Sequence, residues 1–350
     1  MSGWSATLQG AEAASFADVL LLARSVLPEA LIGERGWERL AARAGGLPPS
    51  AADAMFGFEC RLDDASADAS ADLLLSVHPD APFADALVRD GASGGPKARA
   101  LARFLSDLKR PDSPFARGEV DLVALEYDIA GVEDSPAPGV FLRSTGDAGH
   151  TGAGLLATAI ALAAGWNEEP AERNGLAGVL AALPPGGAVR WAGAFPDRRR
   201  RALRLLVRGL GSDGAAFLSR IGWTGDAAHL EEVVSAFRAC GVDNHVLALD
   251  LVEGRVAPGI GLELSRMGRS GGWREAIDMM ARKRWCRPEK AVALGKVAGS
   301  ERIWSRAGLS ELHCGIHHVK LALSGRDASA SGGSIMGAKG YIGCVLRPLP

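Results

Sequence analysis

Charged and ionisable side chains recur at alternate positions in short segments whose other positions are apolar. The residues of this kind that could take part in chemistry are Glu59, Arg61, Arg143, Arg204, Arg208, His318, Lys320 and Tyr341. Guanidinium and ammonium groups bind anions, and a carboxylate or a neutral imidazole can accept a proton. If one face of one sheet carries them all, these residues could hold a charged molecule and exchange a proton beside it.

The spacing of these residues predicts β-strands, because successive side chains of a strand point to opposite faces. In 55–63, for example, Phe58 and Cys60 share one face, whereas Glu59 and Arg61 share the other. The same separation of apolar from charged side chains is predicted for 119–129, 140–143, 202–210, 242–252, 260–264, 313–323 and 341–347.

The strand candidates fall into five strand–turn–strand units, each preceded by helical sequence. The units are 55–63 with 72–78, 119–129 with 140–143, 189–195 with 202–210, 242–252 with 260–264, and 313–323 with 341–347. Short connections require antiparallel pairing. We therefore expect an α+β fold in which ten antiparallel strands close into a barrel with helices outside, since closure removes exposed strand edges. An open α+β sheet is the alternative.

The length of 350 residues allows one large domain or two smaller ones. Two of the repeated units are nearly identical around Ala-Pro-Gly turns at 137–139 and 257–259. A repeated unit cannot bury its apolar face alone. The repeat therefore favours a single domain over 1–350, with a helical segment at 1–50 and the five units at 51–350.

Helices on the outside would cover the apolar faces and leave the charged faces pointing into the barrel. Burying so many acids and bases is costly unless the lumen is wide and wet or binds something charged. In the open-sheet alternative, the same charged face would simply be exposed to water.

Five hairpins bracketed by helices, with a polar barrel interior, resemble the aromatic prenyltransferases of the ABBA type, also called PT-barrels. The closest local likenesses are Phe58-Glu59-Cys60-Arg61, Val319-Lys320-Leu321 and Tyr341-Ile342-Gly343. The resemblance covers most of the chain, from the helix at Phe16 onward, and rests on architecture more than on one motif. Members that act on ribosomally made peptides are the subset to compare first, because a wide barrel can admit a peptide segment.

The resemblance implies transfer of an isoprenoid from its diphosphate to an aromatic or peptide acceptor in natural-product biosynthesis. It requires no Asp-rich magnesium motif and no cofactor, although Mg²⁺ is possible. The implied diphosphate ligands are Arg61, Arg143, Arg204, Arg208, Lys320 and Tyr341. Glu59 or His318 would accept the proton that the acceptor loses.

One feature departs from that family, in which lumen tyrosines and other aromatic residues screen the allylic cation from water. The chain contains 2 tyrosines, Tyr127 and Tyr341, and Tyr127 is predicted to face the helices. The alternative function is therefore a barrel without catalysis that binds a precursor peptide or a partner enzyme. A hydrolase that uses a cysteine or histidine is a third possibility, but no nucleophile motif supports it.

Other patterns exclude some functions. A net charge of -2 gives no basic field for nucleic acid or an anionic membrane, and neither a signal peptide nor a spanning segment is visible, so we expect a cytoplasmic protein.

Five scattered cysteines predict reduced, mostly buried thiols. His313 and His317 are predicted to lie too far apart along a strand to share a metal ion. Asp63, Asp64 and Asp68 are interpreted as a solvated turn.

Overall fold

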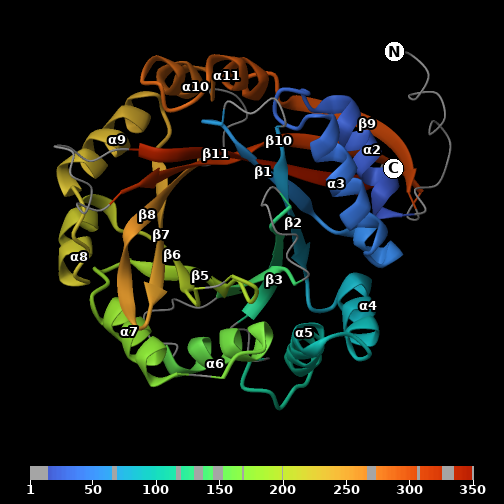
Figure 1. The fold of residues 1–350 in the computed structure, drawn as a ribbon, viewed down its shortest axis with the longest axis horizontal. Helices are drawn as coiled ribbons and strands as arrows, with labels where there is room; N and C mark the ends of the chain where they lie inside the picture. The colour runs from blue at the N-terminus through green and yellow to red at the C-terminus, as the bar shows by residue number, and fades with distance from the viewer. Residues whose placement is uncertain are drawn as a thin grey trace.

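Ten antiparallel strands close into a barrel, and helices surround it on the outside (Figure 1). The structure is a computed structural model that describes residues 15–64, 69–115, 120–129, 137–144, 153–167, 169–198, 200–265, 273–305, 308–324 and 335–348. The barrel strands, in ring order, are β1 (Phe56–Arg61), β2 (Ala71–Val77), β3 (Val120–Tyr127), β4 (Gly139–Ser144), β5 (Ala188–Ala194), β6 (Leu203–Arg208), β7 (Asn244–Val252), β8 (Arg255–Ser265), β10 (Gly308–Leu323) and β11 (Ile335–Pro348). Hydrogen bonding of β11 to both β10 and β1 closes the ring.

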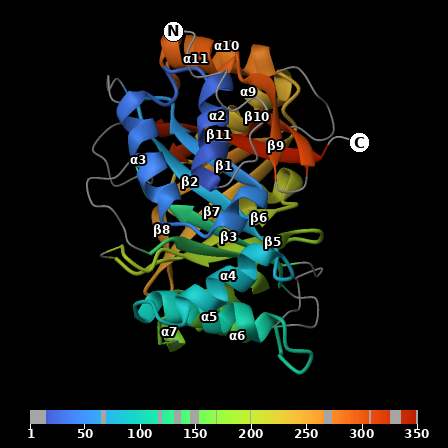
Figure 2. The same ribbon diagram turned by 90° about the vertical axis from the view of Figure 1, so that its right-hand side faces the viewer.

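Helices lie between successive hairpins, and Figure 2 shows them stacked along the side of the barrel. The α-helices of the described residues are α2 (Phe16–Val26), α3 (Glu34–Gly45), α4 (Pro82–Gly91), α5 (Pro96–Leu108), α6 (Ala153–Ala164), α7 (Pro170–Ala181), α8 (Gly214–Arg220), α9 (Ala227–Ala239), α10 (Trp273–Arg282) and α11 (Pro288–Leu294). Two short 3-10 helices, η1 (Pro49–Asp53) and η2 (Gly211–Asp213), precede β1 and α8. Proline occupies the first turn of α4, α5, α7 and α11, where its missing N–H costs nothing. The predicted α+β barrel with helices outside is confirmed, and the open sheet is excluded.

The apolar core lies between the barrel wall and the helices. On β1, Phe56 and Phe58 point outward and contact Phe16 of α2 and Trp37 of α3 with ring centroids 5.2 and 5.5 Å apart. Tyr127 also lies on this side, under the guanidinium of Arg43. Strand parity therefore predicted correctly which face meets the helices, and it leaves the charged face for the lumen.

Register shifts interrupt the alternation of several described strands, including β10 and β5. In β10 the register shifts between Ile316 and His318, so that His317 is an extra residue. The alternation placed His317 with Val319 on the apolar face, but its Nδ1 lies 2.7 Å from Nδ1 of His318. In β5 the shift between Val189 and Trp191 leaves Arg190 as the extra residue. A bulge cannot be read from alternation because it interrupts the period of two.

The last hairpin is longer than the sequence predicts and carries an additional strand. β10 and β11 both extend beyond the predicted segments, and β9 (Ala298–Ser305) pairs with the first half of β10, outside the ring. Cys314 and Cys344 face each other across this hairpin and form a disulfide. The prediction of reduced thiols is therefore wrong for these two residues, because register brings together cysteines that are 30 positions apart in the sequence.

Two further predictions concern segments rather than the barrel. Among the described residues, no helix combines the length and the apolar character needed to cross a bilayer. Of the three aspartates interpreted as a turn, Asp63 and Asp64 follow β1, whereas Asp68 lies outside the described residues.

Candidate functional site

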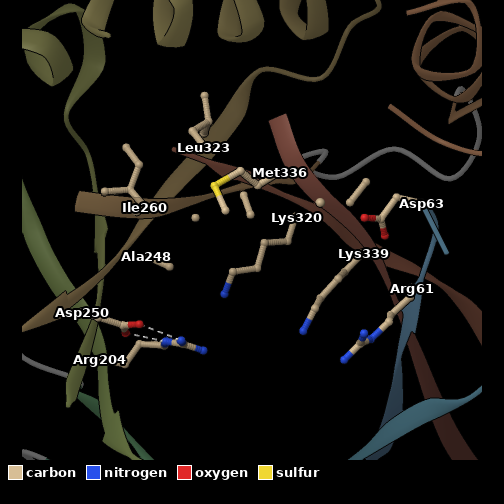
Figure 3. A pocket seen from close by; sticks show the side chains of 15 residues that line it. Arg61, Asp63, Arg204, Ala248, Asp250, Ile260, Lys320, Leu323, Met336 and Lys339 are labelled. Carbon is tan, nitrogen blue, oxygen red and sulfur yellow. Dashed lines mark hydrogen bonds and ion pairs between the residues drawn. The ribbon is translucent and has the colours of Figure 1, made fainter. Parts of the chain in front are cut away.

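A pocket of about 470 Å³ opens in the lumen at one end of the barrel (Figure 3). Four cationic side chains point into it, and they come from four strands: Arg61 on β1, Arg204 on β6, Lys320 on β10 and Lys339 on β11. The apolar part of the lining includes Ala248, Ile260, Leu323 and Met336. The pocket therefore combines a cationic side with an apolar side, as a site for an anion with an apolar tail would.

The strand register explains why the cations meet. Lys320 lies opposite Lys339 in the β10–β11 pair, and Lys339 lies opposite Arg61 in the β11–β1 pair. Like charges directly opposite each other are unfavourable unless carboxylates or a bound anion offset them. Glu263 accepts a hydrogen bond from Lys320 at 3.2 Å, and Asp250 accepts two from Arg204, at 2.8 and 2.9 Å.

Arg61 differs from the other three cations. In the described part of the chain no carboxylate pairs with it, and its side chain is exposed at the end of β1. It is the pocket cation that could bind an incoming anion without first releasing a partner.

Glu59 is held in the lumen by two donors. It is 2 % exposed, and it accepts hydrogen bonds from the hydroxyl of Tyr341 and from Nζ of Lys339. Burial acts to raise the pKa of Glu59, but the charges of Lys339, Lys320 and Arg204 outweigh it and lower the pKa. Glu59 is therefore a fixed anion, and Tyr341 is engaged with it.

His318 is a neutral imidazole beside this group. Its ring stacks on Tyr341 with centroids 3.9 Å apart. Burial, with His317 and Lys320, holds the pKa of His318 well below its usual value. Its Nε2 lies 3.9 Å from a Glu263 oxygen and has no hydrogen-bond partner among the described residues. Because its pKa is lowered, this imidazole is a weak proton acceptor.

Lys339 and Glu126 are among the lumen residues that sequence reasoning missed as site residues. Lys339 precedes the strand predicted at 341–347, and β11 begins at Ile335, so the late boundary hid it. Glu126 alternates with Leu125 and Tyr127 on β3, and this parity could have identified it. Glu126 is 8 % exposed, and its pKa is raised to about 8, first by burial and then by the charge of Glu59.

Arg143 and Arg208 lie at the other end of the barrel. Arg208 comes four residues after Arg204, which is roughly 13 Å along a strand at about 3.3 Å per residue. Arg143 makes a bidentate pair with Asp121, at 2.8 and 2.7 Å. Of the six residues predicted to bind diphosphate, the structure brings Arg61, Arg204 and Lys320 to the pocket, places Tyr341 at Glu59, and brings neither Arg143 nor Arg208.

Phenylalanines contribute aromatic surface where tyrosines are scarce. The rings of Phe141 and Phe195 form an edge-to-face pair 5.4 Å apart, and the guanidinium of Arg204 lies 5.2 Å from the centroid of Phe195. Glycine is required beside both rings, because a Cβ at Gly193 would lie 2.4 Å from Phe141 and one at Gly139 would lie 2.6 Å from Phe195.

No cluster of three or more His, Cys, Asp or Glu side chains within the described ranges is suited to hold a metal ion. No protein-family model matches the chain, and no curated protein matches it either. The function of the pocket is therefore inferred from its residues and from the barrel that positions them.

Proposed function

We propose that the protein is a prenyltransferase-like enzyme of the ABBA type, which transfers an isoprenoid from its diphosphate to an aromatic or peptide acceptor in natural-product biosynthesis. The observation that supports this proposal best is the convergence of four cations from four strands on one pocket inside a closed ten-stranded barrel. A chain that shared only the order of hairpins with these enzymes would not need to bring four cations to one pocket.

The residues of the pocket suit the two parts of such a donor. Arg61, Arg204 and Lys320 would contact diphosphate oxygens, because guanidinium and ammonium groups make charge-assisted hydrogen bonds to phosphate. Their charge would stabilise the diphosphate as it leaves. Ile260, Leu323 and Met336 offer apolar surface to the isoprenoid chain.

The proposal requires no cofactor. If Mg²⁺ accompanies the diphosphate, the carboxylates of the pocket lining that could contact it are Asp63 and Asp250. Asp250 already accepts two hydrogen bonds from Arg204, so Asp63 is the more available of the two.

A barrel without catalysis, which binds a precursor peptide or a partner enzyme, is the second candidate. The pairing of pocket cations with carboxylates favours it: Lys320 with Glu263, Lys339 with Glu59, and Arg204 with Asp250. A lining with both signs of charge suits a peptide segment with both signs, whereas a diphosphate must displace some of the carboxylates.

Calorimetry with dimethylallyl diphosphate tests the first candidate. We expect the wild-type protein to bind it and Arg61→Ala to bind it about 10- to 100-fold more weakly, because a hydrogen bond to a charged group contributes about 1.5–3 kcal/mol. Arg208→Ala is the matched control, since it removes another exposed arginine at the far end of the barrel, and we expect no change. Absence of binding to the wild-type protein at millimolar concentration would overturn the proposal and favour the second candidate.

A further inference from the structure

We propose that Glu126, and not Glu59, is the carboxyl that accepts the proton of the acceptor. This inference rests on the proposed prenyl transfer and assigns its base to a residue on the second hairpin. It follows from a comparison of the two buried carboxyls of the lumen, which differ in the partners that surround them.

Both oxygens of Glu59 are already in use. Oε1 accepts from Nζ of Lys339, and Oε2 accepts from the hydroxyl of Tyr341. A carboxylate in this position is stabilised as an anion, and protonating it would sacrifice the ion pair with Lys339. It is a poor choice of base, but it positions Lys339 and Tyr341 well.

The surroundings of Glu126 are different. Glu126 lies on the lumen face of β3, opposite Leu74 on β2 and Gly139 on β4, and neither neighbour has a polar side chain to offer. Among the described residues no hydrogen bond or ion pair engages its carboxyl, although the residue is 8 % exposed. It is therefore a buried carboxyl that is left available to a ligand.

Charged groups from four other strands act on Glu126. Glu59 of β1 raises its pKa, whereas Arg204 of β6, Lys320 of β10 and Lys339 of β11 lower it. Burial has the largest effect, and together these influences give a pKa of about 8. The three cations also line the pocket, so Glu126 lies within electrostatic range of the place where the diphosphate would bind.

The proposed step transfers the isoprenoid and moves one proton. The allylic carbon–oxygen bond breaks, and its electron pair leaves with the diphosphate. An electron pair of the acceptor forms the new bond to the allylic carbon. The proton that the acceptor then loses goes to the ionised carboxylate of Glu126, which becomes a carboxylic acid and later releases the proton to water.

Steady-state kinetics with the isosteric variants Glu126→Gln and Glu59→Gln tests the assignment. We expect Glu126→Gln to lower kcat by about 100-fold or more with the donor KM nearly unchanged, since general-base catalysis contributes about 10²–10⁴-fold. In the wild-type protein kcat should rise with pH through about 8, and this rise should be absent in Glu126→Gln and shifted in Glu126→Asp. Retention of the rise in Glu126→Gln, or its loss in Glu59→Gln alone, would overturn the inference.

Infrared titration separates this inference from the proposed function. In a wild-type minus Glu126→Gln difference spectrum, the carboxylic acid C=O band should be present at neutral pH and vanish as the pH rises past about 8. If Glu126→Gln does not fold, Glu126→Asp serves instead, and its band should vanish at a different pH. A protein that shows the band but no transfer refutes the transferase proposal, whereas an unchanged kcat in Glu126→Gln refutes the role of Glu126 even in an active enzyme.

Discussion

The two ends of the barrel lumen carry similar residue types, and cations are paired at both ends, but the side chains around those cations differ. At the pocket end, Arg204 and Lys320 point into a cavity together with Arg61 and Lys339. At the other end Arg143, Arg190 and Arg208 lie on the neighbouring strands β4, β5 and β6. There Arg143 is paired with Asp121, and Arg190 donates to the carbonyl of Ser144.

Side-chain size distinguishes the ends as much as charge does. Ala248, Gly261 and Ala322 line the pocket and leave room for the long cationic side chains. At the other end Trp191 lies beside the guanidinium of Arg143, 5.8 Å away. Small neighbours therefore leave a cavity for a ligand beside the cations of the pocket end.

The largest effect that we expect concerns the disulfide, which joins the halves of β10 and β11 farther from the pocket. The double variant Cys314→Ser/Cys344→Ser should lose roughly 3–4 kcal/mol of unfolding free energy, because the bridge closes a loop of 30 residues in the unfolded chain. Urea unfolding without reductant measures this loss of free energy. The control is Cys240→Ser, which replaces a free thiol. Diphosphate binding at the pocket end should stay within about twofold. A loss of binding as large as the loss of stability would show that the ends are not independent.

The next effect is a difference in pH dependence between the ends. Glu126 has a folded pKa of about 8 and an ordinary unfolded pKa near 4.3, so the unfolded chain releases its proton first and stability falls as the pH rises between the two values. Glu126→Gln removes this penalty. Its stability relative to the wild-type protein should therefore increase by about 1–4 kcal/mol from pH 5 to pH 8.

Asp121, at the opposite end, is the control with the opposite sign. Hydrogen bonds from Arg143 lower the pKa of Asp121, so its contribution is present at neutral pH and lost as the pH falls below about 4. Asp121→Asn should therefore be less stable than the wild-type protein at pH 7, with the difference shrinking in acid. Denaturant unfolding as a function of pH measures the free energy of unfolding of both variants. The same pH dependence in the two variants would contradict the opposite pKa shifts of Glu126 and Asp121.

A smaller effect is expected at Arg204 and Arg143, the two arginines that make bidentate pairs with aspartates. Arg204→Lys should destabilise the protein by about 1 kcal/mol, because lysine keeps the charge but cannot reproduce the paired hydrogen bonds to Asp250. Arg143→Lys breaks the same geometry at Asp121, where Arg143 is 31 % exposed against 20 % for Arg204. Its effect should be about half as large. Thermal unfolding of both variants gives the comparison, and an equal or reversed order would contradict it.

The smallest effect concerns the space beside Lys320. A Cβ at Gly261 would lie 2.5 Å from Cε of Lys320, so Gly261→Ala should push the ammonium aside and weaken diphosphate binding about threefold, or ~0.6 kcal/mol. Gly259→Ala is the matched control on the same strand, because its Cβ would meet only the carbonyl oxygen of Leu323 at 3.7 Å. Calorimetry distinguishes them, and equal affinities would show that Lys320 does not contact the ligand.

The sequence allowed more of the fold to be predicted than of the candidate site. Alternation placed Phe58 outward and Glu59 inward, and the repeated hairpins predicted the closed ring, because both depend on local period. Spacing along one strand already separates Arg204 from Arg208, but alternation could not tell at which height Arg143 lies relative to Arg61, because residues on different strands are aligned by register. Alternation also failed at His317, where a bulge breaks the period, and at Cys314 and Cys344, whose pairing depends on the register of strands joined by a long connection.

Closure of the ring has a consequence for how the protein is made. Phe56 of β1 pairs with Cys344 of β11, and α2 packs against β9 and β10. During synthesis β1 therefore emerges from the ribosome long before the strand that covers its edge, and an unpaired edge invites association with other chains. The barrel becomes complete only when β11 has been synthesised, so a pause in translation before Ile335 would expose nascent chains to aggregation.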